Sequence, residues 1–459
     1  MTTKGVLNTD RALLVDLYEL TMAAAYFVHG IRCQATFELF VRHLPPERSY
    51  VVAAGLDSAL SYLEHLHFSD EDVNFLRQHP AFHTVSPEFF DYLRTFRFHG
   101  EVRAVPEGTL IFADEPLLQV TAPVLEAQIA ETYLLSVMHY ETLVASKAAR
   151  VVRAAQGRSV LEFGTRRAHG PEAGVRAARA AVVGGCDATS NVLAGALYDL
   201  PLAGTAAHSW TQVFPSERRS FEALIETFPD TAILLIDTYD PIAGAEIAAT
   251  LGTAIPGVRL DSGDLLEKSR HVREILDRHG LHEAKIVTSG DLNEYRVEQL
   301  VSEGAPIDSF GVGTDLVTSR DVPALSVVYK LVETRHMTDG VVEPKTKFSE
   351  EKVYWPGRKQ VFRFSREGQY HHDLLACARE AYPDATPLLE PVMQEGRRLA
   401  PAPSVKEIRE RTLAHLACLP EAYHALRGAP LYPVEKSAAL EQLLEDVRAK
   451  HFAKATQHV

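Results

Sequence analysis

The chain has 459 residues and a formal net charge of −14 at pH 7. Hydrophobic residues make up 46% of it and charged residues 24%, which indicates a globular protein with several domains and excludes a disordered chain. The acidic balance argues against nucleic acid as a partner, because such proteins normally carry a basic surface. The sequence has no signal-peptide pattern and no apolar run of about 18 residues, which predicts a cytoplasmic protein that has no membrane partner.

The first part of the chain is predicted to be an N-terminal α+β domain over residues 1–123. Apolar residues at helical spacing predict helices at Leu13–Phe27, Leu56–Leu66 and Phe89–Phe96. The run Ala35–Val41 is typical of a strand, and Gly100–Val120 alternates apolar runs with turn residues in the manner of a small β meander.

A change of pattern predicts a second domain over residues 124–335. It opens with a long helical pattern from Leu125 to Ala155. Short strand-like runs then alternate with helix-sized intervals, at Ser159–Phe163, Leu202–Ala206, Ile233–Ile236, Gly257–Leu260, Lys285–Thr288 and Ser309–Val312. Strands joined by helical crossovers build a parallel sheet or barrel. Six predicted strands favour an α/β fold with an irregular (β/α) barrel over a regular eight-stranded one.

The last part of the chain is predicted to form a small β-rich and helical C-terminal region. Residues 336–400 are expected to be a β-rich appendage, because Gly340–Arg363 is rich in strand and turn formers. Residues 401–459 are expected to be helices that pack back on the N-terminal domain, since SAALEQLLEDVRAKHF has apolar positions at helical spacing.

Two arginines and a histidine follow predicted strands of the second domain, where parallel α/β folds bind ligands. Arg166 and Arg167 come after LEFGT, and a planar guanidinium binds phosphate or carboxylate bidentately. The alternative for this pair is a surface salt bridge. His208 ends GTAAHSW and could be a nucleophile that accepts a phosphoryl group, a general base, or a structural histidine.

Three further turns carry polar or glycine residues. VRLDSGD contains Arg259 and Asp261, and its carboxylates could hold ribose hydroxyls or Mg²⁺, or simply cap a helix. TSGDL and GVGTD are glycine turns, which let backbone N–H groups approach a phosphate closely. Tyr18, on the first predicted helix, could stack on an aromatic ligand, although an aromatic residue at helical spacing usually belongs to the core.

Taken together, these motifs resemble the nicotinate phosphoribosyltransferase family of type II phosphoribosyltransferases. The matching segments span almost the whole chain: DLYELTMA, FELFVRHLP, EFGTRRAHGP, GGCDATSNVLAG, GTAAHS, VRLDSGDL, TSGDL, GVGT, PALSVVYKLVE and PGRKQVFR. The resemblance implies an ATP-coupled, ligase-type formation of a C–N bond. Nicotinate and phosphoribosyl pyrophosphate would give nicotinate mononucleotide and pyrophosphate, the first step of NAD salvage from nicotinate. It also implies Mg²⁺, ATP as co-substrate, and a homodimer with the active site at the subunit interface.

The resemblance further implies roles for individual residues. His208 matches the family's phosphorylated histidine, which favours phosphoryl acceptor among its possible roles. The implied catalytic residues are His208, Asp261 and Arg259. The implied nicotinate contacts are Tyr18 (reaching the partner subunit), Thr205, Arg259 and Ser190. The implied contacts to phosphoribosyl pyrophosphate are Arg166, Arg167, Asp261, Ser289, Gly290, Asp291, Gly311, Gly313 and Thr314. No ligands for a resident metal are assigned.

Ser190 aligns with a position where the family distinguishes acid from amide. An acidic residue there would accept from a carboxamide and repel a carboxylate. Asp187 is acidic but lies three residues earlier, so nicotinate is the expected substrate. The alternatives are the same reaction on nicotinamide and a non-catalytic relative that only binds phosphoribosyl ligands.

Overall fold

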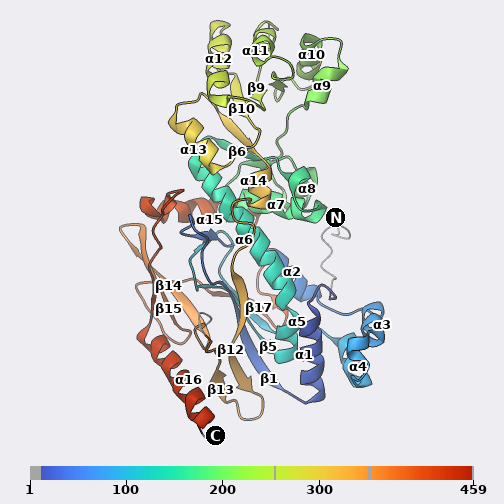
Figure 1. The fold of residues 1–459 in the computed structure, drawn as a ribbon, viewed down its shortest axis with the longest axis vertical. Helices are drawn as coiled ribbons and strands as arrows, with labels where there is room; N and C mark the ends of the chain where they lie inside the picture. The colour runs from blue at the N-terminus through green and yellow to red at the C-terminus, as the bar shows by residue number, and fades with distance from the viewer. Residues whose placement is uncertain (1–11, 253–254, 350–352, 457–459) are drawn as a thin grey trace. The chain divides into compact units, whose positions relative to one another are not determined.

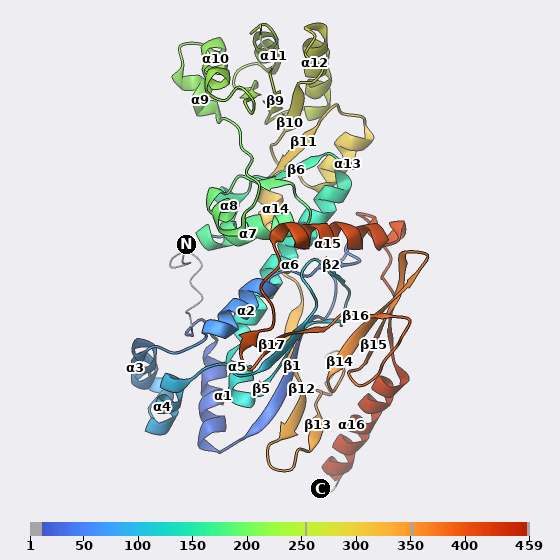
Figure 2. The same ribbon diagram turned by 180° about the vertical axis from the view of Figure 1, so that it is seen from behind.

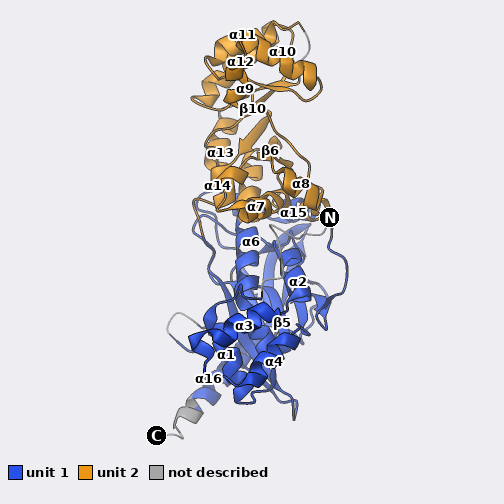
Figure 3. Ribbon diagram, turned by 90° about the vertical axis from the view of Figure 1, so that its right-hand side faces the viewer, with its two compact units in different colours: residues 1–143, 324–403, 411–459 blue, residues 144–323, 404–410 orange. Residues whose placement is uncertain are grey.

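The computed structural model describes residues 12–252, 255–349 and 353–456. It divides the chain into two compact units (Figure 3). Unit 1 comprises Met1–Leu143, Ala324–Pro403 and Arg411–Val459, and unit 2 comprises Val144–Pro323 and Ser404–Glu410. Residues 336–400, expected to be an appendage, therefore lie in the same compact unit as the N-terminal residues. Within the described residues, no helix has both the length and the apolar character needed to span a bilayer.

Unit 1 is built on a seven-stranded antiparallel sheet with the order β13-β12-β1-β5-β3-β17-β18 (Figure 1). Its strands are β1 (Cys33–Val41), β3 (Glu101–Ala104), β5 (Pro116–Pro123), β12 (Val327–His336), β13 (Val342–Pro344), β17 (Glu390–Gln394) and β18 (Arg397–Arg398). The predicted strand at Ala35–Val41 is confirmed as β1, and seven consecutive residues of it are buried. The meander prediction was wrong in part, because β4 (Leu110–Ile111) leaves β3 and β5 to pair with β2 (Val51–Val52).

The predicted helices of unit 1 are confirmed to within a few residues. They are α1 (Leu17–Val28), α2 (Leu56–His65) and α4 (Pro87–Thr95). The structure adds α3 (Asp70–Gln78), which begins at a capping box formed by Ser69 and Asp72. The long predicted helix is divided at Ala130 into α5 (Val124–Ile129) and α6 (Glu131–Ala154).

A second sheet of unit 1 has the order β16-β14-β15-β19. Its strands are β14 (Lys359–Arg366), β15 (Gln369–Cys377), β16 (Thr386–Pro387) and β19 (Val434–Lys436). Arg363 and Asp373 face each other across β14 and β15 and form a buried ion pair at 2.6 Å. The C-terminal helix α16 (Ala438–Thr456) packs against β15 (Figure 2). Helix α15 (Val405–Cys418) contributes residues to both units.

Unit 2 is built on a six-stranded parallel sheet with the order β7-β6-β11-β10-β9-β8. The strands are β6 (Ser159–Glu162), β7 (Ala188–Thr189), β8 (Ile233–Leu235), β9 (Gly257–Leu260), β10 (Lys285–Thr288) and β11 (Ser309–Val312). This confirms a parallel α/β fold, whereas closure into a barrel stays a prediction. The helices that follow these strands are α7 (Pro171–Val183), α8 (Val192–Tyr198), α9 (His208–Val213), α10 (Glu217–Thr227), α11 (Pro241–Ala249), α12 (Leu265–Arg278), α13 (Glu294–Ser302) and α14 (Thr314–Thr318).

One predicted strand of unit 2 was wrong. Leu202–Ala206 forms only an isolated bridge, between Leu202 and Thr189. Leu202 is 53% exposed, and the small residues after it offer little apolar area to bury. The buried strand in this part of the chain is instead the short β7, which lies earlier, at Ala188–Thr189.

A buried ion cluster fixes the start of α13. Lys147 and Arg150 of α6 bind the fully buried carboxylate of Glu294 at 2.5 and 3.0 Å. Lys147 also lies 2.7 Å from Asp321. Glu294 is the first residue of α13, which follows the turn at the end of β10. Removing one member of such a cluster leaves a buried charge uncompensated, so the cluster holds this turn in place.

Candidate active site

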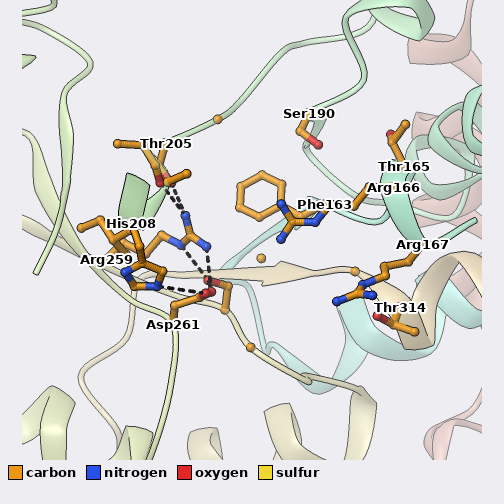
Figure 4. A pocket seen from close by; sticks show the side chains of 18 of the residues that line it. Phe163, Thr165, Arg166, Arg167, Ser190, Thr205, His208, Arg259, Asp261 and Thr314 are labelled. Atoms are coloured by element: carbon orange, nitrogen blue, oxygen red, sulfur yellow. Dashed lines mark hydrogen bonds and ion pairs between the residues drawn. The ribbon is translucent and has the colours of Figure 1, made fainter. Parts of the chain in front are cut away.

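A cavity of about 820 Å³ lies at the ends of the parallel strands of unit 2 (Figure 4). Its size is that of sites for small molecules. All its lining residues belong to unit 2. The predicted residues among them are Arg166, Arg167, Ser190, Thr205, His208, Arg259, Asp261, Ser289, Gly290, Asp291, Gly311, Gly313 and Thr314. The structure thus brings together every predicted site residue except Tyr18, which lies on α1 in unit 1.

Arg259, on β9, is the most highly connected side chain of the cavity (Figure 4). Its Nε donates to the Ser289 hydroxyl at 2.7 Å, and its Nη2 donates to Oδ1 of Asp261 at 2.7 Å. Its Nη1 donates to Oγ1 of Thr205 at 2.5 Å and to the Ala206 carbonyl at 3.1 Å. These four bonds occupy four of the five N–H groups of the guanidinium, so the side chain is held in one orientation.

Asp261 is held ionised by its neighbours. Burial acts to raise the pKa of its carboxyl, but hydrogen bonds from Ser289 and Arg259 and the nearby guanidinium charge outweigh burial and lower that pKa. The Ser289 hydroxyl donates to Oδ1 at 2.5 Å. The backbone N–H of Asp261 donates to Oδ2 of Asp237 at 2.8 Å, which anchors the turn after β9.

His208, the first residue of α9, lies between a hydroxyl and a carboxylate. Its Nδ1 is 3.2 Å from Oγ1 of Thr238, and its Nε2 is 3.7 Å from Oδ2 of Asp261. The imidazole remains 41% exposed. A histidine whose two nitrogens face fixed partners has a defined ring orientation, while its exposure keeps it accessible to a ligand.

Arg166 and Arg167 form a single 3₁₀ turn after β6. Both are exposed and line the cavity. Within residues 12–252, 255–349 and 353–456, the structure gives neither guanidinium a hydrogen bond or an ion pair, so the surface salt bridge considered for this pair is not formed there. Two adjacent guanidiniums with unused donors form a site for an anion with several oxygens.

Glycines at two strand ends allow close backbone approach. Gly290 has a φ of +96°, and a Cβ there would lie 2.0 Å from the Asp261 carbonyl oxygen. A Cβ on Gly311 would lie 2.5 Å from the Phe163 ring. Only glycine fits these positions, so the turns after β9 and β10 pack directly on each other and Phe163 is held against β11.

Comparisons with known proteins identify the family. A Mycobacterium tuberculosis protein named nicotinate phosphoribosyltransferase pncB2 is 44% identical over 455 residues, covering 97% of this chain and 96% of that protein. The chain belongs to the nicotinate phosphoribosyltransferase family. The Bacillus subtilis nicotinate phosphoribosyltransferase is 37% identical, over 94% of each chain. The crystal structure of human nicotinic acid phosphoribosyltransferase matches with a TM-score of 0.81 at 30% identity, covering 94% of this chain and 99% of that one.

Models of the nicotinate phosphoribosyltransferase family match three segments of the chain. The model described as the NAPRTase N-terminal domain matches residues 13–139. The model described as the NAPRTase family matches residues 159–351, which include the whole cavity, and the C-terminal domain model matches residues 381–444. The cavity therefore lies within the segment that the central family model covers.

Sequence reasoning missed several residues of this family member's cavity. They are Phe163, Thr165, Gly204, Ala206, Ala207, Ser209 and Leu235. Phe163 is the one phenylalanine, tyrosine or tryptophan among the described lining residues, and its ring offers an apolar face. Its position directly after the β6 strand was the available signal, because the neighbouring arginines were selected on that ground. Thr238 was missed as well, since its role follows from the position of His208.

Ser190 and Asp187, the two residues considered for the choice between nicotinate and nicotinamide, lie in different surroundings. Ser190 lines the cavity. Asp187 is absent from its lining and accepts instead from Arg409 at 2.6 Å, the Val160 N–H at 3.0 Å and the Ser159 hydroxyl at 2.9 Å. The carboxylate of Asp187 is thus committed to structural contacts outside the cavity.

The oxygen ligands of the cavity fit an ion that is carried by a substrate. No group of three or more histidine, cysteine, aspartate or glutamate side chains that could hold a metal occurs among the described residues. Asp261 and Asp291 both line the cavity. Mg²⁺ is commonly bound by one or two carboxylates together with substrate phosphates and water, so these two side chains suit that ion.

Proposed function

We propose that this chain is a nicotinate phosphoribosyltransferase. The nitrogen of nicotinate bonds to the anomeric carbon of phosphoribosyl pyrophosphate while the bond from that carbon to pyrophosphate breaks, and pyrophosphate leaves with the bonding electrons. The observation that carries the proposal is one cavity, in a chain of this family, where the fixed carboxylate of Asp261 and the glycine turns meet two arginines that have no partner among the described residues.

The charges of the cavity suit this transition state. Positive charge builds on the ribose while negative charge builds on the departing pyrophosphate, and a catalyst must stabilise both as they develop. The ionised carboxylate of Asp261 faces the first charge. Arg166 and Arg167 bind the second, since no hydrogen bond or ion pair among the described residues uses their donors. Mg²⁺ bound to the substrate phosphates would neutralise further charge, with Asp261 or Asp291 as its protein ligand.

The two glycine turns hold the phosphoribosyl group. Ser289, Gly290 and Asp291 lie where the ribose hydroxyls bind, because their turn packs on the backbone of Asp261. Gly311, Gly313 and Thr314 bind the 5′-phosphate, with Thr314 at the start of α14. Backbone N–H groups at such turns reach phosphate oxygens that larger residues would keep at a distance.

Nicotinate lies between Phe163 and the cluster of Thr205 and Arg259. The ring of Phe163 covers the pyridine, and the remaining N–H of Arg259 binds the carboxylate together with the Thr205 hydroxyl. Ser190 is neutral, so it does not repel the carboxylate of a nicotinate bound in this cavity. The commitment of Asp187 to Arg409 favours nicotinate over nicotinamide as the substrate.

His208 couples ATP to the reaction as a phosphohistidine. One imidazole nitrogen attacks the γ-phosphorus of ATP, ADP leaves, and the phosphoryl group passes later to water. The exposed ring, fixed between Thr238 and Asp261, supports this role over that of a structural histidine. A non-catalytic relative would have no use for such a nucleophile, which counts against the pure binding alternative.

The remaining expectations complete the proposal. The enzyme works as a cytoplasmic homodimer, in which Tyr18 of one subunit reaches the nicotinate site of its partner. Tyr18 is 46% exposed on α1, in agreement with a contact to another chain. The parallel sheet of unit 2 is proposed to form part of an irregular barrel.

A direct assay tests the function. The purified chain is incubated with phosphoribosyl pyrophosphate, Mg²⁺ and ATP, and with either nicotinate or nicotinamide. We expect nicotinate mononucleotide and pyrophosphate in equal amounts, with much slower turnover of the amide. Preferred turnover of nicotinamide would show that the same reaction takes place on nicotinamide instead. The absence of product with either base would refute the proposed transferase activity.

A further inference from the structure

A second cavity, of about 520 Å³, lies entirely within unit 1 and shares no lining residue with the cavity of unit 2. It is formed by residues from β3, β12, β13, β14, the end of β15 and α16. Its lining comprises Arg103, Glu333, Arg335, Val342, Pro344, Gly357, Arg358, Lys359, Gln360, Cys377, Ala378, Arg379 and Leu443.

Four arginines line this cavity, against a single carboxylate, Glu333. This is unusual in a chain whose net charge is −14. The neighbouring cation Lys359 is already used: its Nζ lies 2.7 Å from Oε2 of the buried Glu38 and donates to the carbonyls of Trp355 and Gly357. The positive charge that faces the cavity therefore comes from the arginines.

Among the described residues, much of the hydrogen-bonding capacity of these arginines is unused. The Nε of Arg358 is buried and has no partner among the described residues. Arg103 donates from Nη2 to the Leu389 carbonyl at 2.9 Å. For Arg335 and Arg379 the described part of the chain provides no ion pair. A buried guanidinium donor without an acceptor costs free energy that an anion would recover.

Arg103 and Arg358 repel each other, and the nearby carboxylates of Glu101 and Glu390 offset this only in part. The pKa of Arg103 is lowered by burial and by the positive charge of Arg358. A smaller cavity of about 110 Å³ shares Glu333, Arg335 and Arg358 with the larger one. Arg335 and Arg358 thus face both spaces, and an anion bound beside Arg358 would relieve its repulsion of Arg103.

We propose that this cavity of unit 1 is a second anion site, which binds a phosphorylated small molecule. Arg103, Arg335 and Arg358 bind its phosphate oxygens, for which the planar guanidinium is suited. Val342, Pro344 and Leu443 contact the apolar part of the ligand. The volume suits a molecule of nucleotide size, because small-molecule sites commonly measure about 300–1,000 Å³.

The test measures how many pyrophosphate ions each chain binds, with radiolabelled pyrophosphate and equilibrium dialysis. The unit 2 cavity is first disabled by the double substitution Arg166→Gln and Arg167→Gln. We expect this variant to retain one pyrophosphate per chain. Adding Arg335→Gln and Arg358→Gln should weaken that binding about tenfold or more, because charge-assisted hydrogen bonds are lost. Adding Arg366→Gln instead, an exposed residue of β14 outside the cavity, should leave it unchanged.

Folding is checked by the thermal unfolding midpoint of each variant in the absence of anion. The substitutions Arg335→Lys and Arg358→Lys keep the charge and lose the planar fork, so they should give intermediate affinity. The proposal is overturned if the variant with the disabled unit 2 cavity binds no pyrophosphate. It is also overturned if the lysine and glutamine variants bind as tightly as their parent. Neither result depends on transferase activity, which the assay of the unchanged chain tests separately.

Discussion

Nη2 of Arg259 lies 2.7 Å from Oδ1 of Asp261, two residues further along the same strand end. The contact joins a residue proposed to bind nicotinate to one proposed to face the ribose. Ser289 donates to the same carboxylate oxygen and accepts from Arg259, so Arg259, Asp261 and Ser289 form one hydrogen-bonded cluster. A change in Arg259 should therefore affect both substrate binding and the ionisation of Asp261.

Replacing Arg259 with Gln is expected to lower kcat/KM by about two orders of magnitude, since at least two charge-assisted hydrogen bonds are lost. The pKa of Asp261 is lowered in the native protein by Ser289 and Arg259 against the effect of burial. Without Arg259 that pKa rises, so the carboxylate is protonated at a higher pH. The acidic limb of the pH profile of kcat/KM should move to higher pH.

The control for this prediction is Arg278→Gln, which removes an exposed arginine paired with Glu246. Its pH profile should match that of the unchanged chain. An Arg259→Gln profile with an unmoved acidic limb would show that Asp261 does not govern that limb.

Replacing His208 with Ala should abolish the ATP stimulation while a slower basal transfer continues, because the proposed phosphoryl acceptor is lost and the other cavity residues remain. Intact-mass measurement after incubation with ATP should show one added phosphoryl group on the unchanged chain and none on the variant. His271→Ala, at an exposed position of α12, is the matched control and should still be phosphorylated. Phosphorylation of the His208→Ala chain would assign the acceptor to another residue.

Thr238 is expected to position His208 through the 3.2 Å contact to Nδ1. The hydrogen bond on one imidazole nitrogen determines which nitrogen carries the proton, and hence which one is free to attack. Replacing Thr238 with Val should slow phosphohistidine formation about tenfold, the effect of one lost hydrogen bond. Thr238→Ser keeps the hydroxyl and should restore the rate. The basal transfer without ATP should be equal in all three chains, which separates positioning from a general loss of structure.

The sequence was a sufficient guide where apolar strands end in polar turns. β9 and β10 are rich in branched apolar residues, so Arg259 and Ser289 could be placed at neighbouring strand ends, and the structure confirms that they meet. β7 could not be found in this way, because Ala188 and Thr189 form no apolar run. Its burial depends on Thr189, whose hydroxyl donates to Glu162 at 2.5 Å across the sheet.

Contacts between segments that are distant in the sequence were the second feature that could not be predicted. β12 pairs with β1 although nearly the whole second predicted domain separates them in sequence. No local pattern encodes that pairing, which places residues 327–335 in unit 1. Thr238 was missed for a related reason, since it is recognised only through its contact with His208, 30 residues earlier in the chain.

Gly290 should tolerate no side chain. An added Cβ would lie 2.0 Å from the Asp261 carbonyl, and the φ of +96° is itself unfavourable for alanine. We expect Gly290→Ala to lower kcat/KM about a hundredfold by displacing the turn that carries Asp261. Gly280→Ala is a matched control, because Gly280 has a φ of +77° with open space around it. Gly280→Ala should lower the free energy of unfolding by about 1 kcal/mol. It should leave kcat/KM unchanged. Equal activity of the two variants would refute the close packing of the turns.

Ser190 should set the choice between acid and amide. Replacing it with Asp places a negative charge in the cavity, which repels the carboxylate of nicotinate and accepts a hydrogen bond from the amide of nicotinamide. We expect kcat/KM for nicotinate to fall about tenfold or more and the ratio of nicotinamide to nicotinate turnover to rise, measured in side-by-side assays. Ser190→Asn has nearly the same size without the charge, so it should change the ratio far less. If Asp and Asn changed the ratio equally, shape and not charge would select the substrate, and the position assigned to nicotinate near Ser190 would have to be revised.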